Sequence, residues 1–189
     1  MKKMTLLISA LLLSACTAIP VKTLYKLATT DPMSVDPKVI RTAARMPDWI
    51  EPRVNGAKLE ITAQTEGAEP SKETFILQAM PLALEQSSLE LEAKPGFNLY
   101  VYRVNPADIP RLEAFRDSIK AKKAAGVKIK GSMGAGVDAC YKGELREGEI
   151  LVSNYLRLEA ESGYLPVVVD YNLRQAVDGK NLAELLPPC

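Results

Sequence analysis

The chain has 189 residues, and its 24 lysines and arginines are balanced by 23 aspartates and glutamates, so no large field of one sign is available to attract a polyanion. Nucleic-acid binding is therefore not expected. Histidine is absent, which excludes Ser-His and Cys-His nucleophile pairs and every site where histidine binds zinc or haem. The length and the composition, 47% hydrophobic and 25% charged, fit one globular domain.

The N-terminus has the layout of a secretory signal. Lys2-Lys3 precedes an apolar run over residues 4–13, and small residues then lead to a cysteine in Ser14-Ala15-Cys16. As a helix, the apolar run would span only about 15 Å, roughly half the hydrocarbon thickness of a bilayer. The run is therefore too short to be a stable membrane span.

Leu13-Ser14-Ala15-Cys16 resembles the lipobox of bacterial lipoproteins, in which an apolar residue and two small residues precede an invariant cysteine. The resemblance implies cleavage after Ala15, a diacylglyceryl thioether on the sulfur of Cys16 and a third acyl chain on its new amino group. The partner would then be a lipid bilayer, held through these chains. Because Thr17 and not aspartate follows the cysteine, similarity to enteric lipoproteins implies the outer membrane. The alternative is an ordinary export signal in which Cys16 is incidental.

These features divide the chain into three parts. Residues 1–15 are expected as a lipoprotein signal peptide, residues 16–24 as a lipidated N-terminus and tether, and residues 25–189 as a single globular periplasmic domain. Residues 17–24 are expected to form a tether or a first edge strand that leads away from the lipid. The body resembles small periplasmic lipoproteins of proteobacteria whose role is unknown, and this resemblance implies no activity.

Two cysteines remain besides Cys16, namely Cys140 and the last residue, Cys189. An even pair in an oxidising periplasm favours a disulfide, whereas the alternative is a buried thiol at Cys140 and a free Cys189. Two cysteines without histidine cannot supply a usual zinc site, and no CxxC spacing supports redox chemistry. Neither a metal nor another cofactor is expected.

The first predicted elements of the body are a short helix and a buried tryptophan. Asp36 can cap a helix that begins at Pro37 and ends at Pro47, because the apolar residues between them share one helical face. Trp49 is expected in the core. A turn is then predicted at Asn55-Gly56.

Period-two alternation predicts the next strands. Residues 58–63 alternate between polar and apolar side chains, and residues 74–80 are apolar enough for a strand that is buried on both faces. The clearest alternation lies over residues 88–94, which Pro95-Gly96 joins to a strand over residues 97–104. These last two segments are expected to pair as a hairpin.

The main helix is predicted over residues 109–125, after Asn105-Pro106-Ala107-Asp108 and before Gly126. It must lie against the sheet through an apolar stripe formed by Leu112, Phe115 and Ile119. Five lysines cluster where this helix passes into the next strand, and they are Lys120, Lys122, Lys123, Lys128 and Lys130. We expect them to form a solvated face, and the alternative is contact with anionic head groups.

The only glycine-rich stretch is Gly-Ser-Met-Gly-Ala-Gly at residues 131–136. It fits neither a phosphate loop nor the dinucleotide fingerprint. A bulge, a tight bend or close backbone packing is expected there instead. A strand over residues 137–141 would then carry Cys140 into the core.

A second hairpin is predicted from residues 149–158 and 164–171, with Pro166 at an edge or a bulge, and a short amphipathic turn over residues 182–186. Strands outnumber helices, and most are joined by short turns. The sequence therefore predicts an α+β fold that is mainly antiparallel β, with a sandwich-like or strongly curved sheet of about seven strands and one packed helix.

Three functions are compatible with these features. The favoured one is a non-catalytic binding or structural module, lipid-anchored at the outer membrane, facing the periplasm and binding another envelope protein. An alternative is a carrier or sensor of a small apolar ligand, in a pocket between helix and sheet lined by Phe97, Leu99, Leu112 and Phe115. An enzyme is not expected, but the carboxylates of a hydrolase would come from the pairs Glu90 and Glu92, Glu159 and Glu161, and Asp138 and Asp170.

Overall fold

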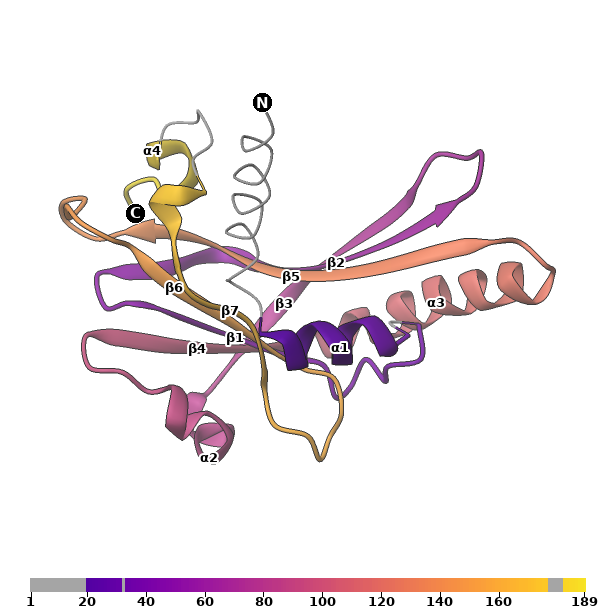
Figure 1. Ribbon diagram of the computed structural model, residues 1–189, viewed down its shortest axis with the longest axis horizontal. Coiled ribbons are helices and arrows are strands. Elements are labelled where there is room, and N and C mark those ends of the chain that lie inside the picture. The colour runs from indigo at the N-terminus through magenta and orange to yellow at the C-terminus, as the bar shows by residue number, and fades with distance from the viewer. Residues whose placement is uncertain (1–19, 32, 177–181) are drawn as a thin grey trace, which may run out of the picture.

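The structure is a computed structural model that describes residues 20–31, 33–176 and 182–189 (Figure 1). Within these residues, seven strands form one antiparallel sheet in the order β5-β2-β3-β4-β1-β6-β7. The strands are β1 (Arg41–Pro47), β2 (Ile50–Thr65), β3 (Ser71–Met80), β4 (Phe97–Val104), β5 (Ile129–Tyr141), β6 (Leu151–Arg157) and β7 (Leu165–Asn172).

Helices flank this sheet and do not alternate regularly with its strands. The described α-helices are α1 (Val21–Thr29), α2 (Gln86–Leu89), α3 (Ile109–Ala124) and α4 (Leu182–Leu185). Single 3-10 turns lie at Leu82–Leu84, Glu90–Glu92, Pro106–Asp108 and Leu173–Gln175. The fold is thus α+β and mainly antiparallel, as predicted, but several helices accompany the sheet where one was expected.

The sheet is strongly curled, so that its two edge strands approach each other across the inside of the curl. Partly buried side chains from both edges, such as Val137 of β5 and Val167 of β7, pack against the main buried cluster. The side-chain amide of Asn154 on β6 donates to the carbonyl oxygen of Ala135 on β5 at 3.0 Å. We call this inside surface the inner face and the opposite surface the outer face. Strands β2, β3 and β5 run out beyond the others, with α3 alongside them (Figure 1).

Helix α3 covers part of the inner face, as its apolar stripe predicted. Leu112 and Ile119 are buried in the main cluster, and Phe115 packs at its margin. Arg116 is buried between them and was not predicted. Its Nε and Nη2 atoms donate to the carbonyl oxygen of Met33 at 2.9 and 2.6 Å, which ties the segment before β1 to the helix.

The C-terminal residues close the other end of the inner face. Trp49 is buried there, as predicted, in a second cluster that includes Ile150 and Leu186. Cys140 and Cys189 form the disulfide that the sequence favours, with their Cα atoms 4.9 Å apart and a sequence separation of 49. Closing a loop of this size contributes about 4 kcal/mol in the chain-entropy account. The chain end is therefore fixed to β5.

The predicted helix over residues 37–47 is wrong, because most of this segment is strand β1. Asp36 does accept a hydrogen bond from the amide of Lys38 at 2.9 Å, but the chain makes only a turn there. Strand β1 lies between β4 and β6, and residues 42–47 are buried on both sides of the sheet. Pairing on both edges and burial on both faces outweigh the local helical pattern.

Two further segments form helix where a strand or tether was predicted. Residues 17–24 were expected to form a tether or a first edge strand, but helix α1 begins at Val21, directly after Pro20. Residues 88–94 were expected to form a strand paired with 97–104, yet they form helical turns, and β4 pairs with β1 and β3.

The positions of two leucines explain why residues 88–94 do not form the predicted strand. An alternating strand would place Leu89 and Leu91 on one buried face. In the structure Leu89 is fully buried, whereas Leu91 is 97% exposed. A helical turn separates them, because residues two apart point in different directions around a helix.

The glycine-rich residues 131–136 form neither a bulge nor a bend, because they run in regular register along β5 opposite β2. The register shift lies in β2 instead, between Pro52 and Ala57, where Asn55 has a φ of 57°. A Cβ atom at Gly56 would lie 2.5 Å from the carbonyl oxygen of Asp138. Close backbone packing therefore requires glycine at position 56, where the sequence predicted only a turn.

The remaining strand predictions agree with the structure in large part. Strand β2 contains the predicted segment 58–63, and β4 occupies residues 97–104. Strand β3 forms as predicted but is not buried on both faces, because Ile76 is 37% exposed. Strands β6 and β7 pair as the second hairpin, and Pro166 lies in edge strand β7. The five lysines after residue 119 are exposed.

We predict that Arg116→Met lowers the free energy of unfolding by about 1–3 kcal/mol, because the carbonyl of Met33 stays buried and loses its donors. Urea denaturation measures this change. Lys120→Met is the matched control, at an exposed position of the same helix, and should stay within about 0.5 kcal/mol of the wild type. Equal losses in the two variants would contradict the account of Arg116.

Candidate functional site

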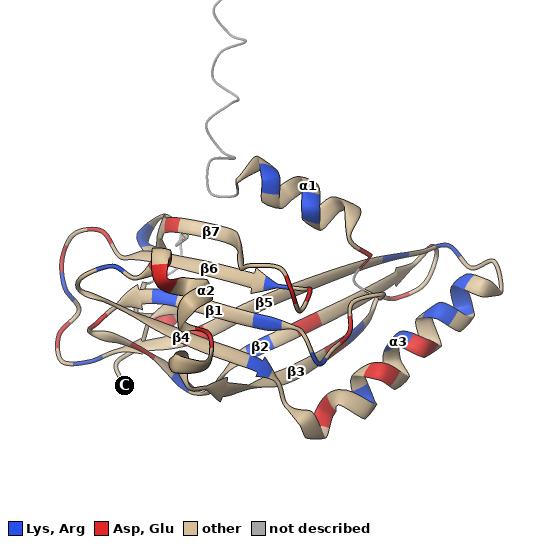
Figure 2. Cartoon of the chain, turned by 90° about the horizontal axis from the view of Figure 1, so that it is seen from below, with Lys and Arg blue, Asp and Glu red and all other residues tan. Residues whose placement is uncertain are grey.

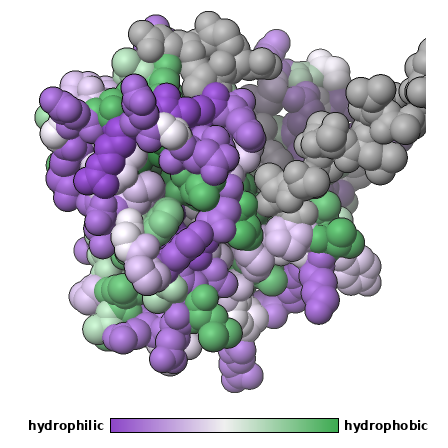
Figure 3. Space-filling view, turned by 60° about the vertical axis from the view of Figure 1, so that its left-hand side comes forward, coloured by the Kyte–Doolittle hydropathy of each residue, from purple (hydrophilic) through white to green (hydrophobic). Residues whose placement is uncertain are grey.

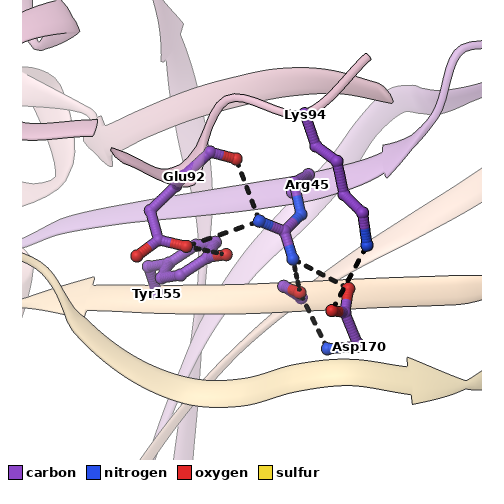
Figure 4. Close-up of polar contacts among 6 residues, drawn as sticks. Arg45, Glu92, Lys94, Tyr155 and Asp170 are labelled. Carbon is purple, nitrogen blue, oxygen red and sulfur yellow. Dashed lines mark hydrogen bonds and ion pairs between the residues drawn. The ribbon is translucent and has the colours of Figure 1, made fainter. Parts of the chain in front are cut away.

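A polar cluster on the outer face is centred on Arg45 of β1 (Figure 4). Its guanidinium is almost fully buried. Nη1 donates to the carbonyl oxygen of Glu92 at 2.9 Å and lies 3.4 Å from the Glu92 carboxylate. Nη2 donates to Ser153 Oγ at 2.9 Å and to Asp170 Oδ1 at 2.8 Å. One guanidinium therefore joins β1, β6, β7 and the segment before β4.

The partners of Arg45 are themselves held by further bonds. The hydroxyl of Tyr155 donates to Glu92 Oε2 at 2.6 Å, and Lys94 Nζ lies 3.4 Å from Asp170 Oδ2. Asp170 has a φ of 46°, a conformation that costs free energy for a residue with a side chain. Its amide donates to Ser153 Oγ at 2.9 Å, so the network holds it in this conformation.

A second charged cluster lies on the outer face around Glu85, whose side chain is also buried. Arg157 donates to both of its carboxylate oxygens, at 2.7 and 3.0 Å. The Nε atom of Arg41 lies 3.6 Å from the same carboxylate. The ring of Tyr164 covers Arg157, with 5.5 Å between the guanidinium carbon and the ring centre.

Both clusters attach one segment to the sheet. Glu85 and Glu92 belong to residues 81–96, which join β3 to β4 and which we call the outer strap. Between them, Leu89 packs against a small buried cluster on the outer face that includes Val101 and Tyr155. Arg45 and Arg157 each have carboxylate partners here, and removing those partners would leave a costly unpaired charge. The two clusters therefore fix the outer strap on either side of an apolar contact.

Burial shifts the pKa values of three side chains in these clusters, namely Tyr155, Tyr164 and Arg41. Burial raises the pKa of Tyr155 to about 12, and its hydrogen bond to Glu92 acts in the same direction. Burial also raises the pKa of Tyr164 and lowers that of Arg41, which lies near the charge of Arg157. A general acid or base works best when its pKa lies near the working pH.

The six carboxylates weighed for a hydrolase are not assembled as pairs. Glu92 and Asp170 meet around Arg45, so a cation lies between them. Asp138 pairs with Lys58, and Glu159 pairs with Lys26, each at 2.6 Å. Glu90 and Glu161 are exposed, and Glu90 lies on a 3-10 turn and not on the predicted strand.

The expected apolar pocket is also not formed by the four residues named for it. Leu99 packs on the outer face beside the outer strap, and Phe97 lies against Arg45 and Lys94 there. Leu112 and Phe115 belong to the main cluster of the inner face. The sheet separates the two pairs, so they cannot line one cavity.

A different apolar cavity lies on the inner face near the disulfide end, with a volume of about 230 Å³. It is small compared with the volumes of about 300–1,000 Å³ that usually hold small ligands. Its lining comes from both sides of the curl and includes Ala44, Ile50, Val137, Ala139, Val152 and Leu173. An open groove of about 550 Å³ separates the C-terminal end of α1 from residues 131–133 of β5.

One group of potential metal ligands is present among the described residues, formed by Glu51, Cys140 and Cys189. Both sulfur atoms are joined in the disulfide, so they offer no thiolate to a metal. The arrangement therefore does not fit a metal site.

Exposed apolar side chains are scattered over the surface. On the face in Figure 3, hydrophobic residues form separate green patches among hydrophilic ones. The most exposed large apolar residues of the described chain are Leu91 at 97%, Val54 at 93%, Val21 at 80% and Tyr25 at 73%. Two of these four lie on the nine-residue helix α1.

The arginine clusters were missed by the sequence interpretation. Arg41, Ala43 and Arg45 would lie on one face of a strand, which is a usable signal, but the helix predicted there concealed it. Glu85 carries no comparable signal, because the outer strap has no regular pattern. The predicted cleavage and lipidation positions, Ala15 and Cys16, lie outside the described residues.

We predict that stability falls as the pH rises from about 10 to about 12. An unfolded tyrosine ionises near 10, whereas the pKa of Tyr155 is raised to about 12, so over this range the unfolded state releases a proton that the folded state retains. Tyr155→Phe should show a shallower fall of the free energy of unfolding in urea titrations at each pH. Identical pH slopes for variant and wild type would refute this assignment.

No protein-family model, curated protein or solved structure matches the chain, so these comparisons assign it to no family. Among the described helices, none has both the length and the apolar character needed to cross a membrane.

Proposed function

We propose that the protein is a lipid-anchored envelope lipoprotein of the bacterial outer membrane, facing the periplasm and acting as a non-catalytic binding or structural module. The observation that carries this proposal is Leu13-Ser14-Ala15-Cys16 at the end of a short apolar run after Lys2-Lys3. Three acyl chains at Cys16 would make attachment effectively permanent, since each buried methylene contributes about 0.8 kcal/mol and one chain alone is marginal.

The disulfide between Cys140 and Cys189 supports an extracytoplasmic location. Such bonds persist in oxidising compartments such as the periplasm and are rare where thiols are kept reduced. Here the bond fixes the chain end, which would otherwise be free to fray. Export and the disulfide are thus mutually consistent features of one proposal.

The use of the buried charges supports a module without catalysis. Arg45, Arg157 and their carboxylate partners hold the outer strap to the sheet. Ser153 is 2% exposed and already accepts two hydrogen bonds, so its hydroxyl is poorly placed to meet a substrate. These groups stabilise the fold. Binding would then take place on the exposed surface of the domain.

We predict that the wild-type protein sediments with membranes and that its intact mass shows acylation at Cys16 and the two-hydrogen deficit of the disulfide. Cys16→Ser should remain in the soluble fraction without acyl chains. The double variant Cys140→Ser, Cys189→Ser is the matched control, because it removes cysteines but keeps the anchor. A Cys16→Ser protein that is still cleaved after Ala15 and still sediments would refute the anchor.

We further predict that the protein partner contacts the outer strap, where binding would bury the exposed side chains of Leu84 and Leu91. A photo-crosslinking amino acid at Leu91 should give a reproducible protein adduct in cells, identified by mass spectrometry. The same amino acid at Lys120, exposed on α3, should give none. Absence of an adduct at Leu91 would contradict the predicted contact.

A further inference from the structure

Helix α1 directs an apolar stripe away from the body of the protein. Val21, Leu24, Tyr25 and Ala28 follow the spacing i, i+3, i+4 and i+7, which places them on one side of a helix. Val21 is 80%, Leu24 45% and Tyr25 73% exposed, and Ala28 is exposed as well. Apolar side chains at helical spacing normally face a core, so this helix presents its stripe in the opposite direction.

The other side of α1 is fixed to the body, so the stripe cannot turn inward. Thr23 is buried, and Leu27 packs against the main cluster of the inner face. Lys26 Nζ bonds to Glu159 after β6 at 2.6 Å. These contacts lie on the side of the helix opposite Val21 and Tyr25, at 100° per residue.

The covalent chain keeps this stripe close to the proposed anchor. Five residue steps separate Cys16 from Val21, so a fully extended chain spans at most about 18 Å between them. With its acyl chains in the hydrocarbon, Cys16 would lie at the membrane interface. Helix α1 would then begin within that short distance of the lipid head groups, whatever the conformation of the intervening residues.

We propose that α1 lies on the bilayer surface, with Val21, Leu24, Tyr25 and Ala28 in the interface beside the acyl chains of Cys16. This inference rests on the proposed lipid anchor. Tyrosine suits the interface, since its ring is apolar and its hydroxyl polar, and the exposed Lys22 at the side of the stripe can extend toward phosphate groups. Four side chains alone bind weakly, but the anchor makes the contact intramolecular and so raises its effective concentration.

The contact would orient the whole domain. Helix α1 packs against β7, and Figure 2 shows it above β7, with β3 and β4 on the opposite side of the sheet. Val54 lies in an open pocket formed with residues of β3 and β4. The β7 side would therefore face the bilayer, and Val54 would face away from it.

Brominated-lipid quenching of tryptophan emission tests this orientation. The acylated protein is placed in vesicles of phosphatidylethanolamine and phosphatidylglycerol, with or without bromine on the acyl chains, and vesicle binding is checked by flotation. Tyr25→Trp places the probe on the stripe, and Val54→Trp is the matched control at a position that is 93% exposed. The wild-type protein, whose tryptophan is the buried Trp49, gives the background emission that is subtracted from that of each variant.

For Tyr25→Trp, we expect the added emission to fall about twofold in brominated vesicles, because an interfacial helix lies near the acyl boundary. The added emission of Val54→Trp should be unchanged. If both variants float but Tyr25→Trp is not quenched, the anchor stands and the placement of α1 is wrong. If the wild type does not float, the anchor fails, and this inference fails with it.

Discussion

The structure depends on covering the apolar inner face of a sheet that curls without closing. In a closed barrel the edge strands would pair and seal the interior, but here β5 and β7 remain the two edges. Segments outside the sheet must therefore exclude water from the inside of the curl. Helix α3 and Met33 cover one end, and the C-terminal residues cover the other end with the help of the disulfide.

Polar contacts hold these covering segments in place on both faces. Arg116 bonds a backbone carbonyl on the inner face, whereas Arg45 and Arg157 bind carboxylates of the outer strap on the outer face. Each guanidinium is largely desolvated, so its partner is required and not optional. In the described chain, these buried guanidiniums therefore mark points where covering segments are attached to the sheet.

The sequence alone could predict the elements whose local pattern agrees with their tertiary surroundings. Helix α3 and strand β4 were found because caps, turns and periodicity all indicate the same structure. Strand β1 was missed because its burial on both faces removes alternation, and the outer strap was missed because its leucines mimic a strand. The alternation of Arg41, Ala43 and Arg45 is a local signal for the arginines, but their carboxylate partners come from distant segments, so no local pattern identifies those partners.

Helix α1 differs from the other covering segments, because mainly its polar side contacts the body. Leu27 packs against the main cluster, and Lys26 bonds to Glu159. Its remaining apolar side is accounted for if a bilayer lies beside it, and the short chain between Cys16 and Val21 would allow this contact. Neutron reflectometry of the acylated protein on a supported bilayer measures this arrangement most directly. We predict protein density in contact with the head groups, with no water layer between them. A resolved water layer beneath the protein, or no bound protein at all, would contradict the account.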